Sequence, residues 1–249
     1  FYWVLACVLH YFYLNIQPMM LKLFFYLIIF LSFVVSANAQ NQPELQQEIR
    51  EMSKLKDPEK AVKMKEKILK VYALDTVDDA ETIDMLNGII AVDYASEGSF
   101  LKFYEYINFI KNRFNQTSMM NMAAGSLLDS GKYLNKAVDI AKETIERYYS
   151  FKDDPSAKPA NFDEADWKRF RNYAQYPYYD TYARGLYFNQ QYDSALLYQR
   201  RSFDGLPEEA IPSSAERYAR LLELTGRKKE AKKYLYNMAV TGKLTGGMI

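Results

Sequence analysis

The sequence has little of the two residue types on which most enzyme chemistry depends. Its 249 residues include one cysteine, Cys7, and one histidine, His10. Both precede residues 36–40, SANAQ, whose small side chains are typical of a cleavage junction for export. Cleavage there would leave a product without a thiolate, an imidazole base, a disulfide or a Cys/His metal site. We therefore expect no catalytic residue, no cofactor and no metal site in the exported segment.

The chain also lacks an excess of charge of either sign. It contains 32 basic and 31 acidic residues, and Lys22 is the only charged residue before Gln40. The segment that begins at Gln40 is therefore neutral overall. Proteins that bind DNA or RNA need a basic surface, because neutralising phosphates supplies much of their affinity. This composition argues against a nucleic-acid partner.

Long apolar runs are confined to the first 39 residues. Met19 is a plausible start, Lys22 forms a short positive region, and the apolar run 23–35 leads to small residues at Ala37 and Ala39. This order is that of a signal peptide. The run is short for a membrane span, which needs about 20 apolar residues. We expect cleavage after Ala39 and export of residues 40–249 to the periplasm or cell envelope.

Residues 1–18 are apolar and aromatic as well, which leaves a second interpretation of the leader. They could form a first membrane helix that pairs with the run 23–35 as a hairpin. Pro18 interrupts the run just before Met19 and Met20, so translation from one of these methionines is the simpler account. In either case, contact with a membrane would come only through an uncleaved leader.

Almost no alternating β-branched segment occurs after the leader, and apolar residues recur at intervals of three and four. This periodicity predicts an all-α fold. One helix should begin after Asp57 as N-cap, with Pro58 in its first turn, and end near Tyr72. Further helices are expected over residues 79–97, 99–114, 117–130, 134–148, 164–174, 178–188, 194–203, 214–225 and 228–240. The one long connection, 151–161, is expected to be a surface loop within a single helical domain, residues 40–249.

An internal repeat turns these helices into an architecture. Three residues of one segment recur 36 positions later in a second copy: Ala183, Leu186 and Ala195 match Ala219, Leu222 and Ala231. Tyr192 opens the second helix of the first copy, and Gly226 occupies the turn of the second copy. Small residues at such positions let two helices approach closely. The segments resemble tetratricopeptide (TPR) repeats, which implies antiparallel helix pairs stacked as a right-handed solenoid.

The amino-acid sequence of the segment 40–249 also resembles the helical region that precedes the thioredoxin-fold domain in exported thiol-disulfide oxidoreductases of the TlpA/ResA-like family. The stretches that carry this resemblance are MLNGIIAVDYA, FIKNRFNQTSMMNMAAGSL, SFKDDPSAKPANFDEADWKRF, YPYYDTYARGLY and PSSAERYARLLELTG. In that family the redox work belongs to a Cys-x-x-Cys motif in the following domain, and nothing in residues 40–249 matches it. The resemblance implies a C-terminal thioredoxin-fold partner domain. Because residues 241–249 carry no charged cap, we expect the native chain to continue past Ile249.

The 22 tyrosines allow two interpretations of residues 173–187. Tyrosines with an apolar ring and a polar tip suit a groove that grips an extended peptide, and they also fill seams between packed helices. Seam packing is the commoner use. If a peptide groove is present, its candidate residues are Tyr176, Tyr179, Tyr182, Arg184, Tyr187 and Arg220.

Two functional hypotheses follow. The chain is either a non-catalytic helical-repeat module of a larger exported oxidoreductase, or a free-standing periplasmic protein that binds a protein or peptide. Coding sequence for a thioredoxin fold after Ile249 would support only the first.

The leader generates the first prediction, that the exported protein begins at Gln40. Intact-mass analysis of the protein recovered from the envelope should give the mass of a chain that starts there. Retention of Lys22 in that product, or a product embedded in the membrane, would contradict the cleavage assignment.

Overall fold

The computed structural model describes residues 43–158, 162–204 and 212–248. The chain divides into two compact units, residues 1–51 and 52–249. Of the first unit, residues 43–51 are described, and they are helical. The leader, with Cys7, His10 and the junction after Ala39, lies outside the described residues. So does the segment 205–211.

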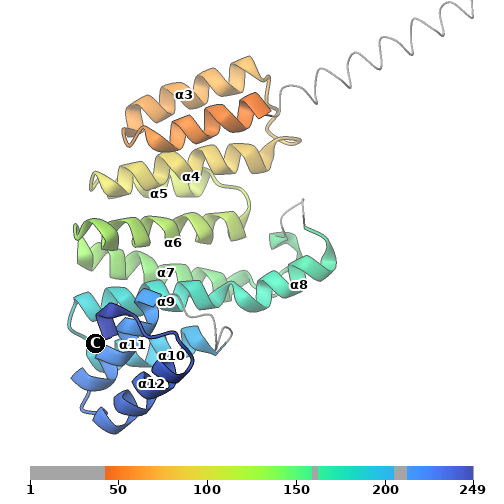
Figure 1. Cartoon of the computed structure of the whole chain (residues 1–249). Helices are drawn as coiled ribbons and strands as arrows, with labels where there is room; N and C mark the ends of the chain where they lie inside the picture. The colour runs from red at the N-terminus through yellow and green to blue at the C-terminus, as the bar shows by residue number, and fades with distance from the viewer. Residues whose placement is uncertain (1–42, 159–161, 205–211, 249) are drawn as a thin grey trace, which may run out of the picture. The chain divides into compact units, whose positions relative to one another are not determined.

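The second unit is all-α, and no strand occurs in the described part of it. Figure 1 shows how its helices follow one another. They are α3 (Pro58–Val71), α4 (Ala80–Ser96), α5 (Phe100–Phe109), α6 (Arg113–Ser130), α7 (Leu134–Phe151), α8 (Glu164–Tyr173), α9 (Gln175–Phe188), α10 (Tyr192–Phe203), α11 (Pro212–Leu224) and α12 (Lys228–Val240). Short 3-10 turns lie at η1 (Pro155–Ala157) and η2 (Gly246–Met248). Consecutive helices pack on one another from α3 to α7 and from α8 to α12, and α7 packs on α9, which makes the array repeat-like.

The start of α3 follows the sequence expectation. The side chain of Asp57 accepts a hydrogen bond from the backbone N–H of Lys60 at 3.0 Å, and Pro58 lies in the first turn. The helix ends at Tyr72 as its C-cap. The side-chain oxygen of the N-cap Asp57 satisfies one of the N–H groups in the first turn that have no partner inside the helix.

The helix expected over residues 99–114 was wrong at its C-terminal end. It ends at Phe109, and α6 begins at Arg113. The buried carboxylate of Asp84, from α4, accepts hydrogen bonds from the backbone N–H groups of Lys111 and Asn112 at 2.8 and 2.9 Å. Asn112 in turn caps the next N–H groups of α6. These amides are held by side chains, so they cannot continue the i to i−4 ladder of α5.

Two helix pairs, α9/α10 and α11/α12, close through the same turn. The backbone N–H of Gln191 donates to the carbonyl of Leu186 at 2.9 Å, and Arg227 donates to Leu222 at 2.7 Å. These four residues are related by the same 36-residue offset found in the sequence. The residue directly before the donor has a positive φ in both turns, +59° at Gln190 and +76° at Gly226.

The pair α4/α5 closes through the same turn, although its residues are not related to those of the other two pairs by the 36-residue offset. Ser99 donates to the carbonyl of Tyr94 at 2.9 Å, and Gly98 has φ +83°. A Cβ at Gly98 would also lie 2.4 Å from the hydroxyl of Tyr133. Glycine is favoured there because of its left-handed conformation, and a larger residue would also displace the Tyr133 ring.

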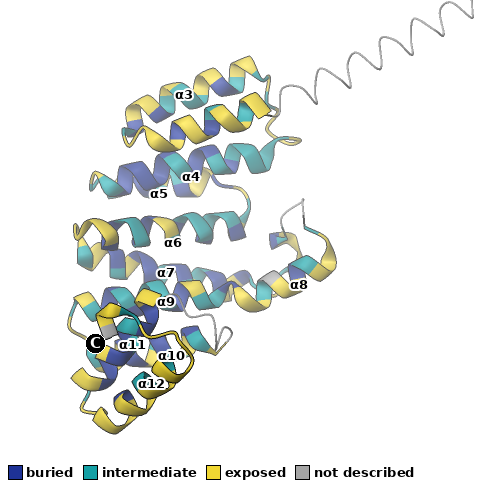
Figure 2. Ribbon diagram, viewed as in Figure 1, coloured by how far each residue is buried: buried dark blue, intermediate teal, exposed yellow. Residues whose placement is uncertain are grey.

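The residues assigned to helix seams are mostly buried, as Figure 2 shows for the helices that carry them. Those with 5% or less of their surface exposed are Ala183, Leu186, Ala195, Ala219, Leu222 and Ala231. Tyr192 is half-buried and packs against the cluster of Leu186 and Leu196, whereas Gly226 is exposed in its turn. A second cluster, around Tyr148 and Trp167, holds α7, α8 and α9 together.

We predict that leucine at Ala195 or Ala231 overpacks its seam and lowers the free energy of unfolding by about 1–3 kcal/mol. Both alanines are almost fully buried. Ala239, an exposed alanine of α12, provides the control. Ala239→Leu should change stability by less than about 0.5 kcal/mol. Denaturant unfolding followed by circular dichroism measures all three. Equal stability of the Ala195→Leu, Ala231→Leu and control proteins would contradict the seam assignment.

Candidate functional site

A hollow of about 560 Å³ opens between α9 and α11. Its lining comes almost entirely from the first helix of each pair, together with one residue of the C-terminal segment. The lining residues are Asp129 of α6; Asp180, Arg184, Tyr187 and Phe188 of α9; Ser213, Ser214, Glu216, Arg217 and Arg220 of α11; and Gly247. We call this hollow the α9–α11 groove.

Three of the six groove residues proposed from the sequence line the α9–α11 groove. They are Arg184, Tyr187 and Arg220. The first two lie three residues apart on α9, so they share a face of that helix with Asp180. Arg220 faces them from α11.

The other three proposed residues are tyrosines that do not line the groove. Tyr179 and Tyr182 lie with their ring centroids 5.8 and 4.6 Å from that of Tyr198 in α10. Tyr176 is half-buried and lies 6.0 Å from Tyr173, centroid to centroid. Helix α9 therefore uses one face for aromatic contacts with its neighbours and another for the groove.

A buried polar network forms one wall of the groove. Arg217 donates from Nε to Gln199 at 2.6 Å and from its terminal nitrogen to Asp180 at 2.7 Å. Gln199, which is fully buried, donates to Asp180 and to Ser202, both at 2.8 Å. Burial lowers the pKa of the Arg217 guanidinium, and the carboxylate of Asp180 opposes this effect. These contacts connect α9, α10 and α11.

Sequence reasoning did not identify Arg217 or Gln199 as part of a site. One clue was present. Asp180 and Arg217 are 37 residues apart, which is one more than the repeat offset, so an acid and a base occupy adjoining positions on successive first helices. Without the tertiary structure, this pair is one of many acid–base combinations at similar spacing.

Charges in the groove balance each other. Arg184 pairs with Asp129, and Arg217 pairs with Asp180. Arg220 is largely exposed and lies 3.7 Å from Glu223, which is too long for a strong ion pair. The groove therefore offers hydrogen-bonding groups without a strong field of one sign, which suits a polar, uncharged ligand.

The C-terminal segment of the chain lies against the groove. The hydroxyl of Thr245 donates a hydrogen bond to Glu216. Gly247 lies so close to the Glu216 carboxylate that a Cβ there would be 2.5 Å from the carboxyl carbon. The turn η2 packs on α11, and Figure 1 places the C-terminal end of the chain beside that helix. Glu216 thus contacts a short stretch of the chain that contains a threonine and a glycine, Thr245 and Gly247.

No metal-ligand cluster forms at the groove or elsewhere in the part of the chain that the structure describes. Across residues 43–158, 162–204 and 212–248, no three His, Cys, Asp or Glu side chains converge as metal ligands. Over the same ranges, no helix combines the length and the apolar character that crossing a bilayer requires. The arrangement supports binding through hydrogen bonds and aromatic contact.

Comparison with protein-family models, with curated proteins and with solved structures finds no match to this chain.

Asp93 of α4 is the described acid whose burial most clearly opposes its charge. Its side chain is 3% exposed, and its Oδ2 has no hydrogen-bond partner among the described residues. Burial raises the pKa of Asp93 above its ordinary value; Lys56 lowers it, and Glu97 and Asp57 raise it further. Because the pKa of Asp93 is higher in the folded state than in the unfolded state, the free energy of unfolding falls as pH rises from the unfolded pKa to the folded one.

We predict that Asp93→Asn is more stable than the parent protein at about pH 7, and that the difference shrinks toward zero at about pH 3, where the parent carboxyl is protonated in both states. Denaturant unfolding at a series of pH values measures this. Asp139→Asn is the control, because the Asp139 side chain is 66% exposed. A stability difference for Asp93→Asn that does not vary with pH would contradict the assignment.

Proposed function

We propose that residues 40–249 form a non-catalytic, protein-binding module of an exported cell-envelope protein, built as a right-handed TPR-like stack of helix pairs. The α9–α11 groove is its binding site, and the ligand is an extended segment of a partner protein. The observation that carries the proposal is the contact of residues 245–247 with Glu216 in that groove.

The TPR-like stack is supported by matched geometry at the repeat offset. Leu186 and Leu222 accept the same turn hydrogen bond, and Ala195 and Ala231 are both buried. Stacked repeats of this kind present the first helix of each pair along one continuous surface, which they use for binding. The helices α6, α9 and α11 line the groove in that order.

The class of ligand follows from the groove's polar groups. Two of its arginines, Arg184 and Arg217, are paired with Asp129 and Asp180, so a strongly charged ligand would have to displace an existing ion pair at either of them. Glu216 accepts a hydrogen bond from a threonine hydroxyl, and the adjacent glycine brings the backbone close to α11. The groove therefore favours an extended segment with small and hydroxyl-bearing residues beside Glu216.

The parent protein is proposed to be a TlpA-like thiol-disulfide oxidoreductase. The module would hold a partner or substrate for a thioredoxin-fold domain, because thiol-disulfide exchange needs a thiolate that residues 40–249 do not contain. The alternative is a free-standing periplasmic binding protein. A Cys-x-x-Cys motif in the continuing reading frame supports the first, and a stop codon soon after Ile249 supports the second.

The binding proposal predicts that the groove takes the chain's own C-terminal segment when that segment is supplied as a separate peptide. Residues 40–242 should bind the peptide Lys-Leu-Thr-Gly-Gly-Met-Ile, residues 243–249, in a saturable way. In an NMR titration, the backbone amide signals of Arg184, Tyr187 and Arg220 should shift.

Glu216→Ala should weaken this binding about tenfold, because a hydrogen bond to a charged group contributes about 1.5 kcal/mol or more. Glu223→Ala, on the same helix but outside the groove, should leave the affinity within about twofold. Circular dichroism checks that each variant is folded. Absence of saturable binding, or equal weakening by the two variants, would overturn the groove assignment.

A further inference from the structure

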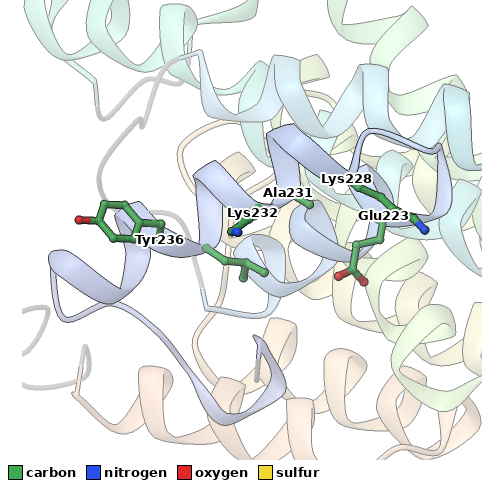
Figure 3. Close-up of a pocket in the computed structure, with 6 residues that line it drawn as sticks. Glu223, Lys228, Ala231, Lys232 and Tyr236 are labelled. Atoms are coloured by element: carbon green, nitrogen blue, oxygen red, sulfur yellow. The ribbon is translucent and has the colours of Figure 1, made fainter.

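A second hollow, of about 600 Å³, lies on the outer side of the last helix pair. Figure 3 shows Lys228, Ala231, Lys232 and Tyr236 along α12, with Glu223 of α11 near Lys228. Leu235 completes the lining. We call this surface the α12 outer face. It is separate from the α9–α11 groove, with which it shares no residue.

The repeat shows what covers the same face in the preceding pair. By the 36-residue offset, Lys232 and Leu235 of α12 correspond to Leu196 and Gln199 of α10. Leu196 is 3% exposed and Gln199 is fully buried. Leu196 belongs to one apolar cluster with Leu221 of α11, and α11 packs on α10. The corresponding face of α10 is thus covered by a helix.

On α12 this face is uncovered in the described part of the chain. The only fully buried residue of α12 is Ala231. Tyr236 is 68% exposed, and so is Val240 one turn further on. Large apolar side chains that are exposed together on one helix mark a contact surface more often than scattered ones do. Figure 2 shows how much of α12 is exposed compared with the helices of the preceding pairs.

The charge on the α12 outer face indicates the chemistry of the occupant. Lys228 and Lys232 lie one turn apart, and neither forms an ion pair with any residue that the structure describes. The acid of the same helix, Glu230, is engaged by Arg200 and Arg227. Glu223 is the one acid in the hollow's lining, and it lies 3.7 Å from Arg220.

The position that holds the buried, apolar Leu196 in α10 holds Lys232 in α12. A purely apolar helix that covered α12 would remove water from the Lys232 ammonium without offering it a partner, which is unfavourable. A carboxylate opposite each lysine removes this cost. We propose that the α12 outer face binds an amphipathic helix of a partner protein that carries acidic residues beside its apolar stripe. The apolar stripe packs on Leu235 and Tyr236, and the acids pair with Lys228 and Lys232.

The test uses a synthetic, fluorescently labelled amphipathic helix as the probe. Leucines repeat at intervals of three and four, and glutamates flank them. A second peptide carries lysine in place of every glutamate. Residues 40–249 should bind the acidic peptide in a saturable way and bind the basic peptide about tenfold more weakly or not at all, because like charges oppose each other across the contact. Fluorescence anisotropy measures both.

The α12 helix supplies a matched pair of variants. Lys228→Glu with Lys232→Glu reverses the two lysines that line the hollow. Lys229→Glu with Lys233→Glu makes the same change of net charge one position along, at exposed lysines outside the lining. The first variant should lose about tenfold in affinity for the acidic peptide, and the second should lose less than about threefold. Tyr236→Ala should also weaken binding, and circular dichroism confirms that each variant is folded.

Four results would overturn the proposal. Equal weakening by the two double variants would mean that the attraction is non-specific. Equal binding of the acidic and basic peptides would mean that the lysines do not select the occupant. Absence of saturable binding would exclude an acidic helix. A dimer in sedimentation equilibrium that Lys228→Glu with Lys232→Glu dissociates would assign the face to a second copy of this chain.

Discussion

The closing turn of each helix pair decides which faces of this molecule meet. In the pairs α4/α5, α9/α10 and α11/α12, one residue takes a positive φ, and the next amide returns to a carbonyl five residues earlier. Glycine adopts this conformation freely at Gly98 and Gly226, whereas Gln190 does so at a cost of about 1 kcal/mol. The turn sets the register between the two helices, so small residues such as Ala195 and Ala231 lie at their contact.

The buried Arg217 connects this repeat to the groove. A cation that is 9% exposed needs close partners, and Asp180 and Gln199 supply them from the two helices of the preceding pair. One side chain thereby holds α9, α10 and α11 in a fixed relation, and that relation opens the α9–α11 groove. The α12 outer face lies on the last α-helix that the structure describes, and among the described residues only the short turn η2 follows it.

Local patterns in the sequence were enough to predict the helices and the equivalence of the last two pairs. Apolar residues at intervals of three and four define a helix by themselves, and the capping of α3 by Asp57 depends only on residues within one turn. The 36-residue offset placed Ala195 and Ala231 at equivalent buried positions because a repeated unit buries the same face each time it occurs. The sequence also places its only cysteine and histidine, Cys7 and His10, before the expected cleavage site, which favours binding over catalysis for the segment that follows.

Only the tertiary structure decided where those helices end and what each face touches. The break before α6 depends on Asp84, which lies 27 residues before the amide that it holds, and no local pattern contains that contact. Tyr182 and Arg184 were proposed for the same groove, yet the tyrosine packs on α10 and the arginine lines the hollow. Periodicity states that a helix has a face to bury, but the neighbour that covers it comes from distant sequence. For the same reason, the exposure of Lys232, at the position where Leu196 is buried, could be recognised only from the packed structure.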